Sequence, residues 1–96
     1  MATPASETED GLGDLIGRDV VIDMESPYVY VGTLIGQDHG HLTLAKADVH
    51  DLRDTNTTRE VYVLDSKRHG IRANRMQVLV CRDGIVSLSA LDDVIE

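Results

Sequence analysis

The architecture of this chain follows from Tyr28-Val-Tyr-Val-Gly-Thr-Leu-Ile-Gly-Gln-Asp38 and from His39-Gly-His-Leu-Thr-Leu44 directly after it. β-Branched and aromatic residues dominate both parts, which favours two long strands. The strands meet at an Asp/His/Gly corner, where a carboxylate and two imidazoles stand side by side. Loops held by a rigid sheet often carry binding residues, so we expect any functional site to lie at this corner.

The first of these strands indicates how the sheet is shaped. Alternation puts Tyr30 and Leu34 on one face and Val29 and Val31 on the other, so both faces are largely apolar. Two glycines, at positions 32 and 36, interrupt the strand where a small barrel has to bend sharply or let another backbone approach. This spacing predicts a strongly curved barrel rather than a flat sheet.

Turn and periodicity signals predict the elements on either side. Residues 1–10 are polar and acidic and are expected to be a disordered tail, which leaves residues 11–96 as a single domain. Leu12, Leu15 and Ile16 predict a short helix that ends at Gly17. Val20–Ile22 then predicts a strand.

The residue patterns after the Asp/His/Gly corner predict three further strands. Leu42–Ala45 forms one strand, which residues 47–53 continue. Met76–Arg82 and Ile85–Leu88 predict a hairpin that turns at Asp83-Gly84. Residues 89–96 then end the chain as a short strand or turn.

Between the third and fourth strands, helix and strand compete. Thr57-Thr-Arg-Glu60 matches a capping box, Val61 and Leu64 follow at helical spacing, and Gly70 provides a stop. We therefore expect a helical insertion over Thr58–His69. Val61-Tyr-Val63 keeps a strand open as the alternative.

Charge limits the classes of partner. The 96 residues carry a formal charge of −8, which argues against uniform attraction to nucleic acid or to an anionic membrane. The charge is uneven, because residues 53–82 hold seven bases and three acids, so this segment is +4 and the remainder −12. The densest cluster of basic residues in this segment suits either phosphates or the acidic surface of a neighbouring subunit, and we favour the neighbouring subunit. The cluster consists of Lys67, Arg68, Arg72 and Arg75.

The single cysteine and the hydropathy pattern bear on location. Cys81 lies in an apolar run, so we expect a buried thiol, and one cysteine allows no internal disulfide. No apolar segment reaches the length of a membrane span, and the first ten residues do not resemble a secretion signal. We expect a cytoplasmic protein that binds no membrane.

Histidines and acids define the candidate sites. The corner suits a plain turn best, then a base-binding rim, and a metal site least of all; its residues are Asp38, His39 and His41. No metal or cofactor is expected. Asp48, His50 and Asp51 suit a solvent-facing strand end better than an acid–base set. No nucleophile motif surrounds the serines, so no catalytic residue is assigned and the chain is not expected to be an enzyme.

Several fixed points together resemble a known family. Leu15-Ile-Gly-Arg-Asp-Val-Val-Ile22, Tyr30-Val-Gly-Thr-Leu34 and Leu42-Thr-Leu44 resemble the first motif of Sm and Sm-like (LSm) proteins. Gln77-Val-Leu-Val-Cys-Arg82 with Ile85-Val-Ser-Leu88 resembles the second. The resemblance implies an Sm-like, SH3-type barrel of five antiparallel strands behind an N-terminal helix. It also implies hexameric or heptameric homo-oligomeric rings, in which the fourth strand of one subunit pairs with the fifth of the next.

The same resemblance implies a site for uridine- or adenine-rich single-stranded RNA at the inner rim of the ring. His39 would then stack on a base, His41 would read its edge, and Arg82 would supply charge or hydrogen bonds. The chain departs from the family where Asp83 replaces the glycine after this arginine, and where the usual Met-Asn pair is missing from the corner. A structural or protein-interaction ring that binds no RNA is therefore the alternative.

Overall fold

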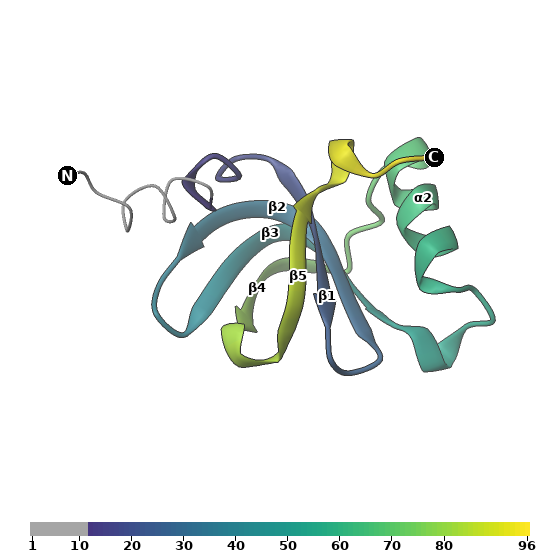
Figure 1. Ribbon diagram of the computed structural model, residues 1–96, viewed down its shortest axis with the longest axis horizontal. Coiled ribbons are helices and arrows are strands. Elements are labelled where there is room, and N and C mark those ends of the chain that lie inside the picture. Colours follow the sequence, from purple (N-terminus) through teal and green to yellow (C-terminus); the bar gives the residue numbers. More distant parts are fainter. Residues whose placement is uncertain (1–11) are drawn as a thin grey trace.

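The computed structural model describes residues 12–96, which form a five-stranded antiparallel sheet bent into a small barrel (Figure 1). The strands lie in the order β4-β3-β2-β1-β5, so β4 and β5 are the two edges of the sheet. The predicted mainly β, five-stranded antiparallel architecture is confirmed. The strands are β1 Asp19–Met24, β2 Tyr28–Gln37, β3 His41–Asp51, β4 Arg75–Cys81 and β5 Ile85–Ala90.

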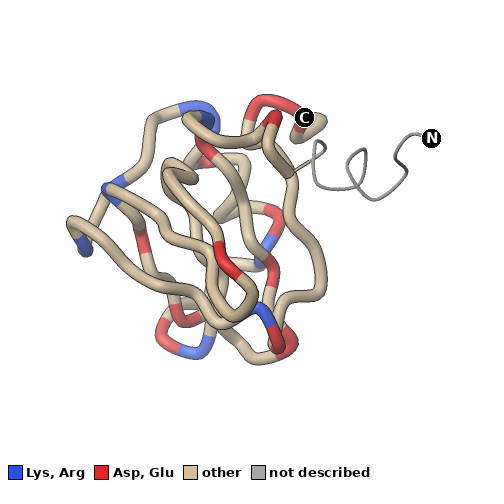
Figure 2. Tube along the Cα trace, turned by 90° about the vertical axis from the view of Figure 1, so that its left-hand side faces the viewer, with Lys and Arg blue, Asp and Glu red and all other residues tan. Residues whose placement is uncertain are grey.

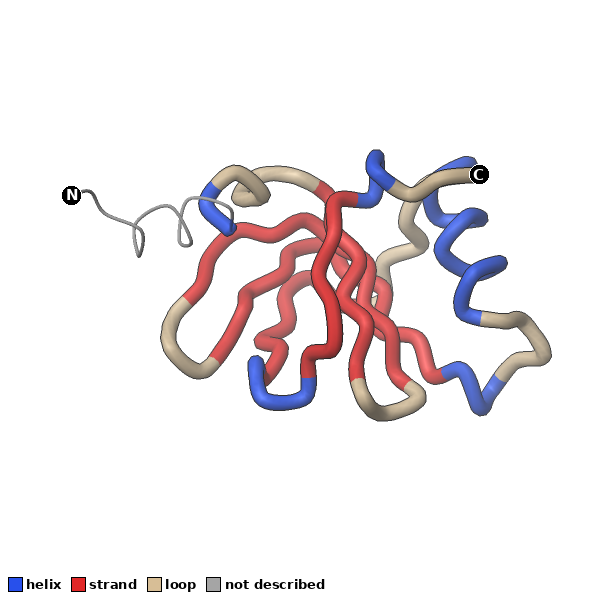
Figure 3. The backbone as a smooth tube through the Cα atoms, viewed as in Figure 1, coloured by secondary structure: helices blue, strands red, loops and turns tan. Residues whose placement is uncertain are grey.

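β2 and β3 curl together through the length of the barrel (Figure 3). At Gly32 the two backbones come so close that an added Cβ would lie 2.9 Å from the Cβ of Ala47. The pairing of β2 with β3 shifts register beside this contact, between Val31 and Thr33, and β3 carries Lys46 at a positive φ of 48°. The close approach expected at Gly32 is confirmed.

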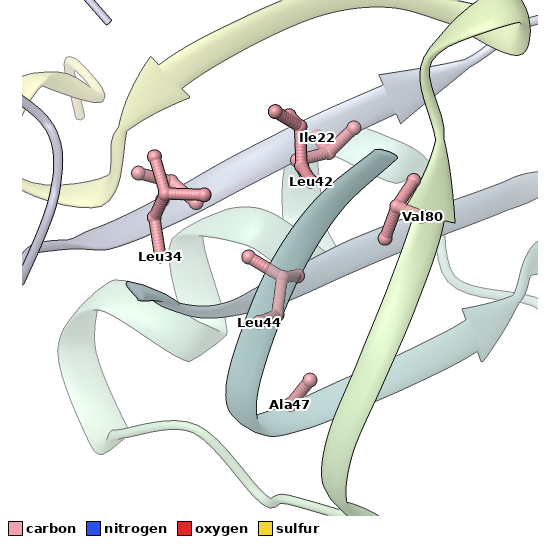
Figure 4. Packing of buried hydrophobic residues seen from close by; sticks show 7 residues of the cluster. Ile22, Leu34, Leu42, Leu44, Ala47 and Val80 are labelled. Carbon is pink, nitrogen blue, oxygen red and sulfur yellow. The ribbon is translucent and has the colours of Figure 1, made fainter. Parts of the chain in front are cut away.

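The barrel interior is filled by aliphatic side chains from β1 to β4 (Figure 4). Every member of the cluster is at most 2 % exposed, and full burial of a Val, Leu or Ile side chain contributes about 1.5–3 kcal/mol. Close packing of these side chains makes the barrel a rigid support for its loops. The members are Val20, Ile22, Leu34, Leu42, Leu44, Ala47 and Val80.

A second cluster lies on the other face of the sheet, beneath a helix. α2 spans Arg59–His69, so the helical insertion is confirmed and the strand alternative is wrong. Its first turn is capped by Thr58, whose side chain accepts a 3.2 Å hydrogen bond from the Val61 N–H, and Gly70 ends it at φ 93°. The cap therefore lies one residue beyond the predicted Thr57. The cluster contains Val21, Val29, Val31, Tyr62, Val63 and Leu91.

The C-terminal residues hold α2 against the barrel. After β5 the chain forms a short 3₁₀ helix, η3 (Leu91–Asp93), and then runs along α2. The Lys67 ammonium donates to the Val94 carbonyl, and the Arg68 Nε lies 2.6 Å from the Glu96 carboxylate. Two members of the predicted basic cluster, Lys67 and Arg68, thus bind their own chain.

Two expectations about the last strands are wrong. β4 and β5 form no hairpin, because the 3₁₀ turn η2 (Arg82–Gly84) redirects the chain and β5 pairs with β1 instead. Cys81 is exposed rather than buried. Strand alternation explains this exposure, since Val80 faces the barrel interior and its neighbour therefore points outward.

The described chain starts with a short helical stretch followed by turns, in agreement with the predicted short N-terminal helix. Residues 12 and 13 are helical, and the Leu15 and Arg18 N–H groups then donate to carbonyls three residues earlier. The first part of the predicted helix and the predicted disordered tail lie outside the described residues. Within residues 12–96 no helix is long and apolar enough to cross a membrane.

Candidate functional site

The corner between β2 and β3 is organised by Asp38. Its carboxylate accepts hydrogen bonds from the N–H groups of Gly40 (2.8 Å) and His41 (2.7 Å), and its own N–H donates to the His41 carbonyl (2.9 Å). These hydrogen bonds lower the pKa of Asp38, and the bond from Gly40 has the largest effect. The carboxylate therefore shapes the turn, and the flanking imidazoles stay exposed.

Arg82 reaches this corner from the far end of β4. Its backbone N–H donates to the Gly40 carbonyl (2.9 Å), and its guanidinium donates to the Asp38 carbonyl (2.7 Å). β3 and β4 also pair beside this corner, where His41 lies opposite Cys81, the residue before Arg82. His39, His41 and Arg82 thus lie on adjoining turns at one end of the barrel, the arrangement that the resemblance to Sm-like proteins implies.

Two further residues belong to this corner. The Gln37 side-chain oxygen lies 3.4 Å from the Arg82 guanidinium, a contact that sequence reasoning missed. Its position as the last residue of β2 before the corner was the available signal. Asp83 is exposed in η2, and no salt bridge joins it to Arg82 in the part of the chain that the structure describes.

The metal alternative receives no support from the geometry of the corner. The His41 Nδ1 lies 3.7 Å from an Asp38 oxygen that already accepts two backbone N–H groups. Within residues 12–96 no three His, Cys, Asp or Glu side chains are arranged to hold a metal ion.

The acids and histidine at the end of β3 occupy a different environment from the predicted solvent-facing one. The Tyr62 hydroxyl of α2 donates to Asp48 at 2.7 Å, and its ring stacks on His50 with centroids 4.0 Å apart. Burial and the bond to Asp48 raise the pKa of Tyr62. The solvent-facing interpretation is therefore wrong for Asp48 and His50, because α2 covers them. Asp51 instead binds Arg53 through both oxygens, at 2.9 and 2.7 Å.

Asn74 links this network to the start of β4. Its side-chain amide donates to Asp48 and to the Val49 carbonyl, both at 3.1 Å, and its side-chain oxygen accepts from the Val49 N–H at 3.0 Å. A pocket of about 370 Å³ opens between β3 and α2, lined by His50, Tyr62 and the end of the helix. Asp48 accepts one hydrogen bond at each carboxylate oxygen, from Tyr62 and from Asn74, whereas the buried Nε2 of His50 has no hydrogen-bond partner within residues 12–96.

Comparison with known proteins reveals the fold. No family model and no curated protein matches the sequence. Among solved structures, the Sm protein of Pyrococcus abyssii in complex with a uridine heptamer is similar over 93% of this chain and 99% of its own, with a TM-score of 0.59 and 16% identity. The chain has the Sm-like fold.

Two further matches come from different assemblies. The SmAP1 heptamer of P. aerophilum matches over 94% of this chain and 96% of its own, with a TM-score of 0.58 and 18% identity. A chain of the NatC complex bound to CoA matches over 82% of each chain, with a TM-score of 0.53 and 18% identity. In this Sm-like barrel the candidate site is the rim where the β2–β3 corner meets η2.

Proposed function

We propose that this Sm-like barrel assembles into a homo-oligomeric ring and binds single-stranded RNA at the rim formed by His39, His41 and Arg82. The observation that carries the proposal is the meeting of two exposed imidazoles and a guanidinium on hydrogen-bonded turns. The similar fold of a Pyrococcus abyssii Sm protein in complex with a uridine heptamer supports it. The proposed role is binding, without catalysis, and a cytoplasmic location stays a prediction.

Assembly is supported by the two edges of the sheet. β4 and β5 each have one neighbour in the sheet, which leaves the other edge of each strand free for another chain. Leu79 in β4 and Val86 in β5 are 58% and 65% exposed. A contact between the β4 edge of one copy and the β5 edge of the next is heterologous, and it closes into a ring when the rotation between neighbouring subunits divides a full turn. We propose a ring of six or seven subunits.

The rim side chains divide the work of binding. An exposed imidazole such as that of His39 stacks on a base whatever the base is, and such stacking is worth about 1–3 kcal/mol. His41 then contacts the base edge. Arg82 keeps guanidinium N–H groups beyond its bond to Asp38, and these suit a phosphate or a base carbonyl. A ring repeats the site in every subunit, so weak contacts add through multivalency.

A protein-interaction role is the second candidate. The net charge of −8 and the carboxylate of Asp83 beside Arg82 both oppose RNA. A chain of the NatC complex shares the fold, so this barrel also occurs within a protein complex. On this candidate the ring forms, but its rim binds no nucleic acid.

Fluorescence anisotropy with labelled uridine-rich and adenine-rich oligonucleotides tests the proposal. We expect binding at low salt that weakens as salt rises, and a loss of about tenfold in His39→Ala, in line with one stacked base. Arg82→Gln is also expected to weaken binding. His69→Ala, which changes an exposed histidine at the end of α2, is the matched control and should bind as the wild type does.

Native mass spectrometry of the same variants separates the two candidates. Intact Arg82→Gln rings that no longer bind oligonucleotide support the RNA-binding rim. Wild-type rings that bind neither oligonucleotide at low salt would refute RNA binding and favour the protein-interaction role. A monomeric wild type at all concentrations would refute the ring.

A further inference from the structure

The two edge strands have opposite directions relative to the turn that joins them. β4 runs toward η2 and β5 runs away from it. When copies surround an axis with their η2 turns facing inward, β4 of one copy and β5 of the next are antiparallel. The start of β4, at Arg75, then lies beside the end of β5, at Ala90, where η3 follows.

These two ends carry opposite charge. Arg75 is exposed at the start of β4, and Asp92 and Asp93 are exposed in η3. Acidic residues colour the chain next to the C-terminus in Figure 2. Within residues 12–96 none of the three side chains takes part in a salt bridge. Unpaired charges of opposite sign at two matched edges are complementary for a second copy of the chain.

We infer that Arg75 of one copy pairs with Asp92 and Asp93 of the next copy, so that an ionic contact sets the direction and register of the ring. This inference rests on the ring of the proposed function. It adds an ionic contact between the first residue of β4 and η3, beyond the pairing of the strand edges.

Both sides of this contact are held in place before assembly. The Arg75 guanidinium donates to the Asn74 carbonyl at 3.0 Å, and Asn74 is itself clamped to β3. On the other side, Leu91 is 6 % exposed in the second cluster, and the segment after η3 is fastened to α2 by Lys67 and Arg68. Preorganised groups lose little conformational entropy on association.

Charge reversal tests the pairing. Arg75→Glu is expected to raise the protein concentration at which half of the rings have dissociated, on the order of tenfold or more, because three acids then face one another. The double variant Asp92→Arg/Asp93→Arg should weaken assembly similarly. Combining it with Arg75→Glu should restore assembly toward the wild type. Native mass spectrometry over a dilution series measures all four proteins.

Arg53→Glu is the control for charge, because it makes the same charge change at an exposed residue just after β3, whose partner is Asp51 of its own chain. It should assemble as the wild type does, and circular dichroism should show every variant folded. If both reversal variants dissociate at the same concentration as the wild type, the pairing is overturned and the ring still stands. A wild type that never assembles would overturn the ring and the pairing together, and failure of the combined variant to recover would also contradict the pairing.

Discussion

Gly32 shows how a single residue shapes this barrel. A side chain there would meet the Cα of Ala47 at 3.0 Å and the carbonyl oxygen of Ala45 at 3.2 Å, both backbone atoms of β3. Backbone atoms move less readily than the end of a side chain, so the space is closed. Gly36 lies only four residues on in the same strand, yet its nearest neighbour, Thr43, would be 3.9 Å away.

The two glycines make a matched pair of substitutions. Gly32→Ala is expected to lower the free energy of unfolding by about 1–3 kcal/mol, because the added methyl overpacks the bend. Gly36→Ala should change it by less than half as much, since the methyl there makes only ordinary contacts. Urea denaturation measures both. Equal effects would mean that the close approach of β2 and β3 is not what requires glycine at position 32.

At the scale of elements, α2 is the part of the fold that depends most on a local signal. Its apolar side chains alone are a weak argument for a helix, because Val61-Tyr-Val63 also suits a strand. The threonine cap and the terminal glycine resolve the choice by satisfying backbone groups at both helix ends. Burial of Tyr62 and Val63 then fastens the helix to the sheet.

The position of the cap is testable with neighbouring threonines. Thr58→Ala should destabilise the protein by about 1 kcal/mol, because the Val61 N–H loses its acceptor. Thr57→Ala removes the same atoms from the residue just outside the helix and should have a smaller effect. Thermal unfolding followed by circular dichroism compares the two. A larger loss in Thr57→Ala would place the cap where the capping-box pattern alone predicts it.

For the whole molecule, carboxylates paired with arginines contribute to the response to acid. The Arg53 side chain lowers the pKa of Asp51 from 3.8 to about 2, and Arg68 likewise lowers the pKa of Glu96. A carboxyl group whose pKa is lower in the folded state stabilises that state fully above its unfolded pKa. The contribution is then lost as the pH falls through the folded pKa.

We therefore expect stability to be nearly constant above pH 4 and to fall as the pH drops from 3.8 to about 2, the range spanned by the Asp51 shift. Asp51→Asn, which cannot titrate, should show a shallower fall in that range. Urea denaturation at several pH values measures the slope. An identical slope in the variant would show that the pair with Arg53 does not contribute to the pH dependence.

The amino-acid sequence by itself determined the features that depend on residues close together in the chain. Strand alternation, the bend at Gly32, the stop at Gly70 and the Asp38 corner all arise within a few residues, so pattern and turn chemistry predict them. The corner and Arg82 were also predicted to meet, although this rested on a resemblance to Sm-like proteins rather than on local chemistry.

Only the tertiary structure decided which side chains are covered and which edges remain open. His50 is covered by Tyr62, Arg68 meets Glu96 across 28 positions, and β5 pairs with β1 rather than with β4. Such contacts join segments far apart in the chain, and the pattern of either segment alone is compatible with several partners. Alternation could have placed Cys81 outward, but only once the packed core had shown which face of β4 is buried.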